Sequence, residues 1–451
     1  MFRSLRSLAT ARSRILLATL FLLASVRPAD AQILQRQVAG VWVDGHGIVR
    51  NIERDEMDHL RKIMQAALVP AAGDMAQFSP LRKVSLRRLE EAINESVRSR
   101  KPIADEMKYL AGLQRVQYVL VYPEERDIVL AGPGEGWRID EHGEVVGLTT
   151  GRPVMLLDDL LTALRSAEGA RQTGISCSID PSNEGITRLR DLVKQLPTGG
   201  DIRPIASAIV DTLGPQSISV TGVPGDSHFA RVIVAADYRM KRLAMNFEEA
   251  PVRGMPSYLD MMHTGSSGMQ NMLPRWWLAP DYGSLLADAS GTAWEIRKAG
   301  VKVMAEEDFV LASGERRPSG KPGRLAKKWA DNMTAHYEEL SVKDPVFGQL
   351  RNCMDLAVVG ALIVQQNLTE RCGHSFPVLL NSNTVPVEHF NIPKQVDSQA
   401  SVLKKGRNWL ISASGGVEIN SWLLIHAPES TASLAPLRTK AAPPAKRWWW
   451  N

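Results

Sequence analysis

Apolar residues recur with a helical period in several parts of the chain. Residues 54–68 and 85–98 carry apolar side chains three and four positions apart, as Leu86, Leu89 and Ile93 do, so each predicts an amphipathic helix with a core-facing side. The same pattern predicts further helices at 154–166, 183–196, 325–340 and 346–366. The last segment includes a nearly continuous apolar run and is predicted to be a long buried helix.

Short β-branched runs around polar turns predict hairpins. Val116–Tyr122 and Asp127–Ala131 form one such pair, and Ser217–Val223 and His228–Ala235 form a second around Pro224-Gly225-Asp226. A helix at Asp237–Phe247 is predicted to follow the second hairpin. Between residues 274 and 304, apolar and polar residues alternate over short runs, which predicts a small antiparallel meander.

Strands and helices are mixed along the chain without a train of strand–helix–strand units. This order predicts an α+β fold built from hairpin and helix units with antiparallel sheet segments. It also predicts a helical N-terminal part and the buried helix near 346–366.

The first 31 residues have the three-part plan of a secretory signal peptide. A basic start is followed by the twelve-residue apolar run Ile15–Val26 and by Ala29-Asp30-Ala31, with cleavage expected before Gln32. A membrane-spanning helix needs about 20 apolar residues, so this run predicts export and removal. The expected location is the periplasm or the outside of the cell, with no transmembrane span left after signal removal.

The mature chain is expected to fold as two α+β modules, at 32–200 and 201–426. Within the second module, residues 313–324 combine glycine, serine and proline with basic residues, which predicts a solvated loop. Residues 427–451 are rich in proline and alanine without periodicity and are predicted to be a disordered basic tail. The rings of Trp448–Trp450 beside Lys446 and Arg447 could touch an anionic envelope surface, although so short a segment is a weak anchor.

The net charge of +5, from 54 basic and 49 acidic residues, is concentrated at the two ends of the chain. Residues 1–31 contribute +4 and residues 427–451 contribute +3, which leaves the body at about −2. Phosphate neutralisation needs clustered basic side chains. Residues 32–426 have no net positive charge, so nucleic acid is not expected to be their partner.

The mature chain contains three cysteines, Cys177, Cys353 and Cys372. Export makes disulfides possible, but three is an odd number, and a chain of this length can bury an adequate core without them. The cysteines are interpreted as small apolar residues, with their redox state left open.

No established catalytic or cofactor motif is complete. Gly132–Gly136 and Gly314–Gly320 lack the spacing of phosphate-binding loops, and Gly265–Gly268 lacks that of a nucleophile elbow. No metal site and no cofactor are predicted. Four polar residues remain as weak catalytic candidates: Asp226, His228, Asp237 and His263.

Trp276 and Trp277 are candidates for ligand binding, because flat ring faces suit the C–H faces of sugars. On a strand, consecutive side chains point to opposite sides, so only one ring can face a given ligand. Core burial of at least one of the two rings is expected.

Four phrases of the chain resemble a family of exported proteins from planctomycete bacteria that is known only as a domain of unknown function. They are Gly225–Lys241, Pro251–Tyr258, Pro274–Pro280 and Gln349–Leu356. The resemblance extends over about 38–426 and implies a bacterial envelope or secreted setting. It implies no activity and no site residues.

The favoured hypothesis is an exported, non-catalytic structural or interaction protein of the cell envelope, with envelope proteins or cell-wall glycan as partners. The alternatives are a secreted hydrolase, whose site would gather the four polar candidates, and a protein that binds carbohydrate or peptidoglycan through Trp276 or Trp277. The sequence leaves the oligomeric state open.

Overall fold

The computed structural model describes residues 37–450, apart from positions 39, 53, 196–202, 265–271, 311–315, 399–402, 406–407, 411–413 and 443–448. The predicted signal peptide, the segment Gly265–Gly268, part of the 313–324 loop and Trp448 lie outside the described residues. The fold is α+β, as the sequence predicts.

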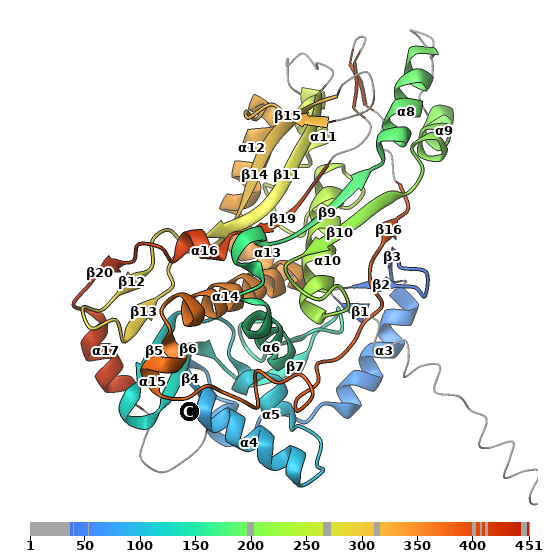
Figure 1. The fold of residues 1–451 in the computed structure, drawn as a ribbon. Helices are drawn as coiled ribbons and strands as arrows, with labels where there is room; N and C mark the ends of the chain where they lie inside the picture. The colour runs from blue at the N-terminus through green and yellow to red at the C-terminus, as the bar shows by residue number, and fades with distance from the viewer. Residues whose placement is uncertain are drawn as a thin grey trace, which may run out of the picture.

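A ten-stranded sheet runs through the molecule (Figure 1). Its strands are, in spatial order, β1 (Gln37–Val38), β2 (Val41–Val43), β3 (Ile48–Asn51), β16 (Gln395–Val396), β10 (Gln216–Thr221), β9 (Ile175–Pro181), β19 (Ser414–Ile419), β11 (Met272–Asp281), β14 (Gly300–Val310) and β15 (Arg316–Pro318). Neighbours are antiparallel except β3 with β16 and β11 with β19. Both predicted modules contribute strands, so this sheet joins chain segments from either side of residue 200.

A six-stranded sheet forms the second layer of strands. Its order is β20 (Glu429–Ser430), β12 (Leu286–Ala287), β13 (Ala293–Glu295), β5 (Tyr118–Tyr122), β6 (Asp127–Gly134) and β4 (Ser79–Ser85). The hairpin β5–β6 confirms the first predicted hairpin, with Arg126 in the left-handed conformation at its turn. Two small ribbons pair β7 (Trp137–Ile139) with β8 (Val145–Gly147), and β17 (Leu403–Lys405) with β18 (Asn408–Leu410).

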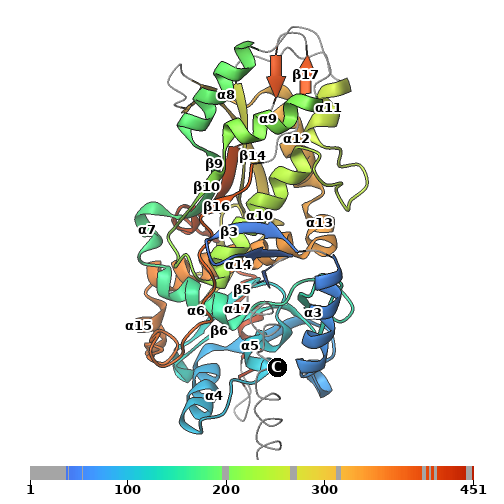
Figure 2. The same ribbon diagram turned by 90° about the vertical axis from the view of Figure 1, so that its right-hand side faces the viewer.

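The helices of the described residues surround and separate these sheets. They are α3 (Arg54–Ala67), α4 (Leu86–Arg98), α5 (Asp105–Lys108), α6 (Leu157–Ser166), α7 (Ala170–Thr173), α8 (Asn183–Gln195), α9 (Arg203–Leu213), α10 (His228–Ala244), α11 (Tyr258–Thr264), α12 (Arg324–Ala335), α13 (Tyr337–Lys343), α14 (Pro345–Gln365), α15 (Leu368–Cys372), α16 (Ser421–Leu424) and α17 (Leu434–Ala441). Figure 2 shows α10, α11 and α12 together on one side of the large sheet.

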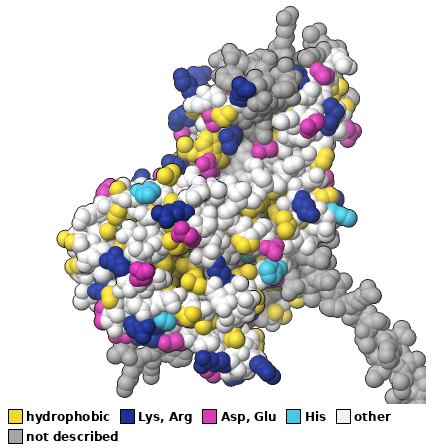
Figure 3. Space-filling view, in the orientation of Figure 1, with side chains coloured by type: hydrophobic (Ala, Val, Ile, Leu, Met, Phe, Trp, Pro, Cys, Tyr) yellow, Lys and Arg dark blue, Asp and Glu magenta, His cyan; other side chains and the backbone are white. Residues whose placement is uncertain are grey.

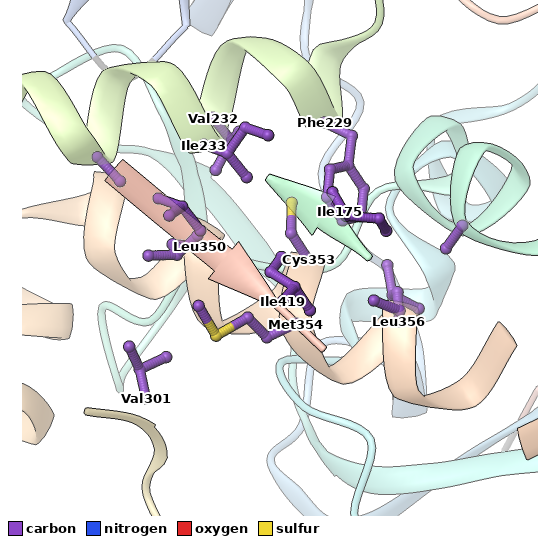
Figure 4. Close-up of a cluster of buried hydrophobic side chains, with 14 of the residues drawn as sticks. Ile175, Phe229, Val232, Ile233, Val301, Leu350, Cys353, Met354, Leu356 and Ile419 are labelled. Carbon is purple, nitrogen blue, oxygen red and sulfur yellow. The ribbon is translucent and has the colours of Figure 1, made fainter. Parts of the chain in front are cut away.

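Helix α14 is the centre of the main core and matches the long buried helix predicted near 346–366. Its side chains Leu350, Cys353 and Leu356 meet Phe229 and Ile233 of α10 (Figure 4). Within the part of the chain that the structure describes, α14 is the one helix long and apolar enough to cross a membrane, but its apolar window is entirely enclosed by protein.

The second predicted hairpin is wrong, because residues 228–235 begin a helix and do not form a strand. The hydroxyl of Ser227 caps α10 by accepting a hydrogen bond from the amide of Ala230 at 3.1 Å. The run Val232–Val234 is apolar on consecutive positions because α10 is buried on nearly all sides, a pattern that periodicity alone cannot separate from a strand. Strand β10 instead pairs antiparallel with β9 on one side and with β16 on the other.

Three other predicted elements differ in extent. The 274–304 meander becomes the long pair β11–β14, while β12 and β13 join the other sheet. The 325–340 helix is interrupted at His336, between α12 and α13. Part of the predicted 313–324 loop is strand β15, which pairs with β14.

The segment 427–451, predicted to be a disordered tail, contains ordered structure. It includes β20 and α17, and Trp449 is buried beside β4, where its carbonyl accepts a hydrogen bond from the amide of Ser85 at 2.7 Å. Contacts with distant parts of the chain order these residues, although their sequence has no periodic pattern that would predict a helix or strand.

Candidate functional site

One face of the ten-stranded sheet is covered by helices. Trp276 of β11 is fully buried on this side and packs against Trp329 of α12, with 4.9 Å between the ring centroids. The thiol of Cys177 on β9 donates to the carbonyl of Ile233 on α10 at 3.2 Å. Alternate residues of these strands must therefore point to the opposite face.

The opposite face carries hydroxyl groups from two neighbouring strands. Strand register places Ser178 beside Ser219 and Ser176 beside Thr221. The hydroxyl oxygens of these pairs lie 2.9 and 2.8 Å apart, and both pairs are exposed to solvent. Figure 3 shows a broad area with few apolar or charged side chains across the middle of the molecule, where these strands lie.

A glycine separates these hydroxyls from an aromatic ring. Gly416 of β19 lies between Ser178 of β9 and Trp277 of β11 in the register of the sheet. A Cβ atom at Gly416 would lie 2.0 Å from the carbonyl oxygen of Cys177, so the close approach of β9 requires glycine here. We call the area formed by Ser176, Ser178, Ser219, Thr221 and Gly416 the hydroxyl shelf.

Trp277 borders the hydroxyl shelf on one side and is half-buried. The guanidinium carbon of Arg275 lies 5.2 Å from the centre of the Trp277 ring. Arg275 Nη1 also lies 3.8 Å from Glu306 Oε2. A cation over an aromatic ring restrains the ring by electrostatic attraction. The arrangement offers an oriented aromatic surface next to a row of hydrogen-bonding groups.

The two tryptophans of the predicted pair thus have different roles. Trp276 lies in the core, where its indole N–H donates to the carbonyl of Ala326 at 3.2 Å. Trp277 is on the open face, so any ligand contact of this pair is confined to Trp277. The expectation that the two rings point to opposite sides of a strand is confirmed.

His228, one of the polar candidates, lies at the start of α10 and faces inward. Its Nδ1 is 3.0 Å from both carboxylate oxygens of Asp159 on α6. Burial alone would lower the pKa of His228, but Asp159, with Glu144 and Asp158 nearby, raises it above its usual value. This histidine is the hydrogen-bonding partner of a buried carboxylate.

The remaining polar candidates lie elsewhere. Asp226 accepts a hydrogen bond at the surface from His389, at 2.9 Å. Asp237 follows His228 by nine residues, which places them about 13 Å apart along the axis of α10. His263 lies in α11, and its side chain is outside the described part of the structure. The structure therefore does not bring Asp226, His228 and Asp237 together.

Asp237 forms a buried ion pair with Lys241. Lys241 Nζ donates to Asp237 at 2.9 Å and to the carbonyls of Ile179 and Gly415, so it ties α10 to β9 and β19. Burial raises the pKa of Asp237 from 3.8 to about 6, against the opposing effect of Lys241. The pair lies on the covered face of the sheet, beneath the hydroxyl shelf.

The three cysteines are free and buried. Burial raises the pKa of all three thiols, and Cys353 additionally donates to Asp159. A thiol with a raised pKa is a poor nucleophile at neutral pH. Among the side chains that the structure describes, no three histidine, cysteine or acidic residues are grouped so that they could hold a metal ion.

Sequence reasoning missed the serine and threonine residues of the hydroxyl shelf. Their signal is present as small hydroxyl residues at alternate positions, 176 and 178 in β9 and 217, 219 and 221 in β10. The predicted hairpin pairs residues 217–223 with 228–235, and this pairing hides the pattern. Only the pairing of β10 with β9 places these hydroxyls side by side.

One comparison with known protein families matches a segment that includes part of the hydroxyl shelf. Residues 177–258 match a family described only as a protein of unknown function (DUF1598). The match begins in β9 and extends through β10 and α10 to the start of α11, so it includes Ser178, Ser219 and Thr221 of the hydroxyl shelf. No curated protein and no solved structure matches the chain significantly.

Proposed function

We propose that the protein is exported to the bacterial cell envelope and binds cell-wall glycan there without catalysing a reaction. The ligand lies on the hydroxyl shelf against the ring of Trp277. The location, in the periplasm or outside the cell, rests on the predicted signal peptide.

The observation that carries this proposal is the position of Trp277 beside paired surface hydroxyls on an open sheet face. A sugar ring presents C–H groups on its faces and hydroxyls around its edge. An aromatic ring next to a row of hydrogen-bonding groups complements both, because the polar groups fix the orientation and the ring supplies apolar contact.

A binding role fits the polar residues better than catalysis does. His228 and Asp237 already have buried partners in Asp159 and Lys241, and they face away from the hydroxyl shelf. A hydrolase would need an acid and a base converging on one accessible point.

The proposal is tested by co-sedimentation of the mature chain, residues 32–451, with purified peptidoglycan. We expect wild-type protein to sediment with the glycan and Trp277→Ala to bind about tenfold more weakly, since losing an aromatic contact of ~1.5 kcal/mol changes an affinity by about that factor. The control is Phe78→Ala, which removes another surface ring, 53% exposed, that is not part of this sheet.

Two results would contradict the proposal. Either wild-type protein stays in the supernatant, or Trp277→Ala sediments as well as wild type and Phe78→Ala. Export is tested separately, since protein recovered from the envelope fraction should have the mass of a chain that begins at Gln32.

A further inference from the structure

Two tryptophans differ from the others in how they pack. Seven of the tryptophans with described side chains belong to, or pack against, the buried clusters: Trp137, Trp276, Trp294, Trp329, Trp422, Trp449 and Trp450. Trp277 and Trp42 do neither, and both are half-buried. Among the described side chains, these two large rings are therefore placed at the surface without a role in the core.

Trp42 lies on the same open face of the sheet as Trp277. In β2, its neighbours Val41 and Val43 are buried, and Trp42 points the other way. Its register partner in β3 is Arg50, which is exposed.

The pairing of successive strands shows that Trp42 and the hydroxyl shelf lie on the same face of the sheet. Two residues before Arg50, Ile48 is paired with Gln395 of β16, and Gln395 is paired with Ser217 of β10. Ser217 lies two residues before Ser219 of the hydroxyl shelf, so both point to one face. Each of the two tryptophans has an arginine close by on this face: Arg50 opposite Trp42, and Arg275 over the ring of Trp277.

The separation of the two rings restricts what could contact both. The strand order places β2 six steps from β11, which at about 4.8 Å per step is roughly 29 Å across the sheet. A right-handed twist of about 20° per step turns the face by roughly 120° over that distance. A short oligosaccharide is too small to span the two rings, and a flat crystalline polymer cannot follow the twist.

We infer that the ligand is a flexible linear glycan polymer that engages both tryptophans at once, with Trp42 as a second binding site. This inference rests on the proposed function of the hydroxyl shelf. The hydroxyl and amide side chains between the two rings, such as Ser217 and Gln395, line the path of the chain. Once one ring holds the polymer, the other meets it at a high effective concentration, so two weak contacts give tight binding.

The experiment compares two ligands: long soluble glycan strands released from peptidoglycan, and a tetrasaccharide fragment of the same strands. Isothermal titration of wild type should give two weak, independent tetrasaccharide sites and a much tighter complex with the long strands. Trp42→Ala and Trp277→Ala should each remove one tetrasaccharide site and weaken binding of long strands at least tenfold. Trp42→Phe retains a ring and should stay within about threefold of wild type.

The outcomes separate this inference from the proposal on which it rests. If Trp42→Ala binds long strands like wild type while Trp277→Ala is weakened, the second site is wrong and the proposed function stands. If Trp277→Ala binds both ligands like wild type, the proposed function itself fails. Thermal unfolding of each variant identifies any loss of binding that is caused by misfolding, and Trp42→Phe then decides the role of the ring at that position.

Discussion

Arg115 and Asp355 are 240 residues apart in the sequence and form a two-pronged ion pair in the core. Arg115 Nε and Nη2 each donate to a carboxylate oxygen of Asp355 at 3.1 Å. The hydroxyl of Tyr282 donates to the same carboxylate at 2.6 Å, as does the amide of Val116 at 3.2 Å. The pair fixes α14 to the segment that leads into β5.

We expect Arg115→Met to destabilise the protein strongly, because it leaves the fully buried carboxylate of Asp355 without its cation. Breaking one side of a buried ion pair costs about 3–5 kcal/mol. Urea unfolding followed by circular dichroism measures the loss. Lys327→Met is the matched control, since its ion pair with Asp331 is exposed and should contribute less than about 1 kcal/mol. Equal losses in the two variants would contradict this account of the core.

The raised pKa of Asp237 predicts a pH dependence of stability. A carboxyl whose folded pKa lies above its unfolded value favours folding at low pH, and that contribution is lost as the pH rises. The pKa moves from 3.8 to about 6, so the loss falls between about pH 4 and 7 and is on the order of 3 kcal/mol at most.

Asp237→Asn should therefore flatten the fall in unfolding free energy between pH 4 and 7. The exposed Asp211→Asn should leave the fall as it is in wild type. Chemical unfolding at several pH values provides the measurement. An Asp237→Asn variant with an unchanged slope would show that this group does not titrate in the range.

Gly416→Ala should be destabilising although its backbone conformation is ordinary. The added Cβ would meet the carbonyl oxygen of Cys177 at 2.0 Å, and two paired strands would have to separate. We expect a loss of about 3 kcal/mol, the upper part of the range for overpacking. Gly45→Ala has open space around it and should change stability by less than about 0.5 kcal/mol. Equal thermal unfolding midpoints for the two variants would argue against the tight β9–β19 contact.

The buried thiols of Cys177, Cys353 and Cys372 should resist alkylation in the folded protein. Burial raises their pKa and blocks access, so few thiolates are available to iodoacetamide at pH 8. Intact-mass measurement should find the native protein unmodified and the urea-unfolded protein with three added groups. Rapid labelling of any one cysteine in native protein would refute its burial.

The periodicity of apolar residues along the chain predicted much of the secondary structure. The helices at 54–68 and 85–98 were predictable because each apolar stripe follows the helical repeat. The segment 346–366 was predictable as a buried helix because its apolar residues extend too far for one strand, and the turn at Pro123–Arg126 marked the β5–β6 hairpin. The alternation of a strand was enough to predict that Trp276 and Trp277 face opposite sides.

Apolar periodicity failed to predict the start of helix α10, because nearly all sides of this helix are buried. Val232–Val234 lie on a helix that is enclosed by the sheet and α14, so its apolar run has no polar side to reveal the period. The order within 427–451 was missed for a related reason, since β20, α17 and Trp449 are fixed by contacts with residues that are distant in the chain.

Local patterns of apolar and polar residues were enough to predict many of the helices and strands of this protein, because each pattern is contained within a single element. The identity of neighbouring strands came from the three-dimensional fold, which pairs Ser178 with Ser219 and places Trp42 and Trp277 on one face of the sheet. Strand pairing joins residues that are far apart in the chain. It depends on how all the elements bury their apolar surface together, and no local pattern contains that information.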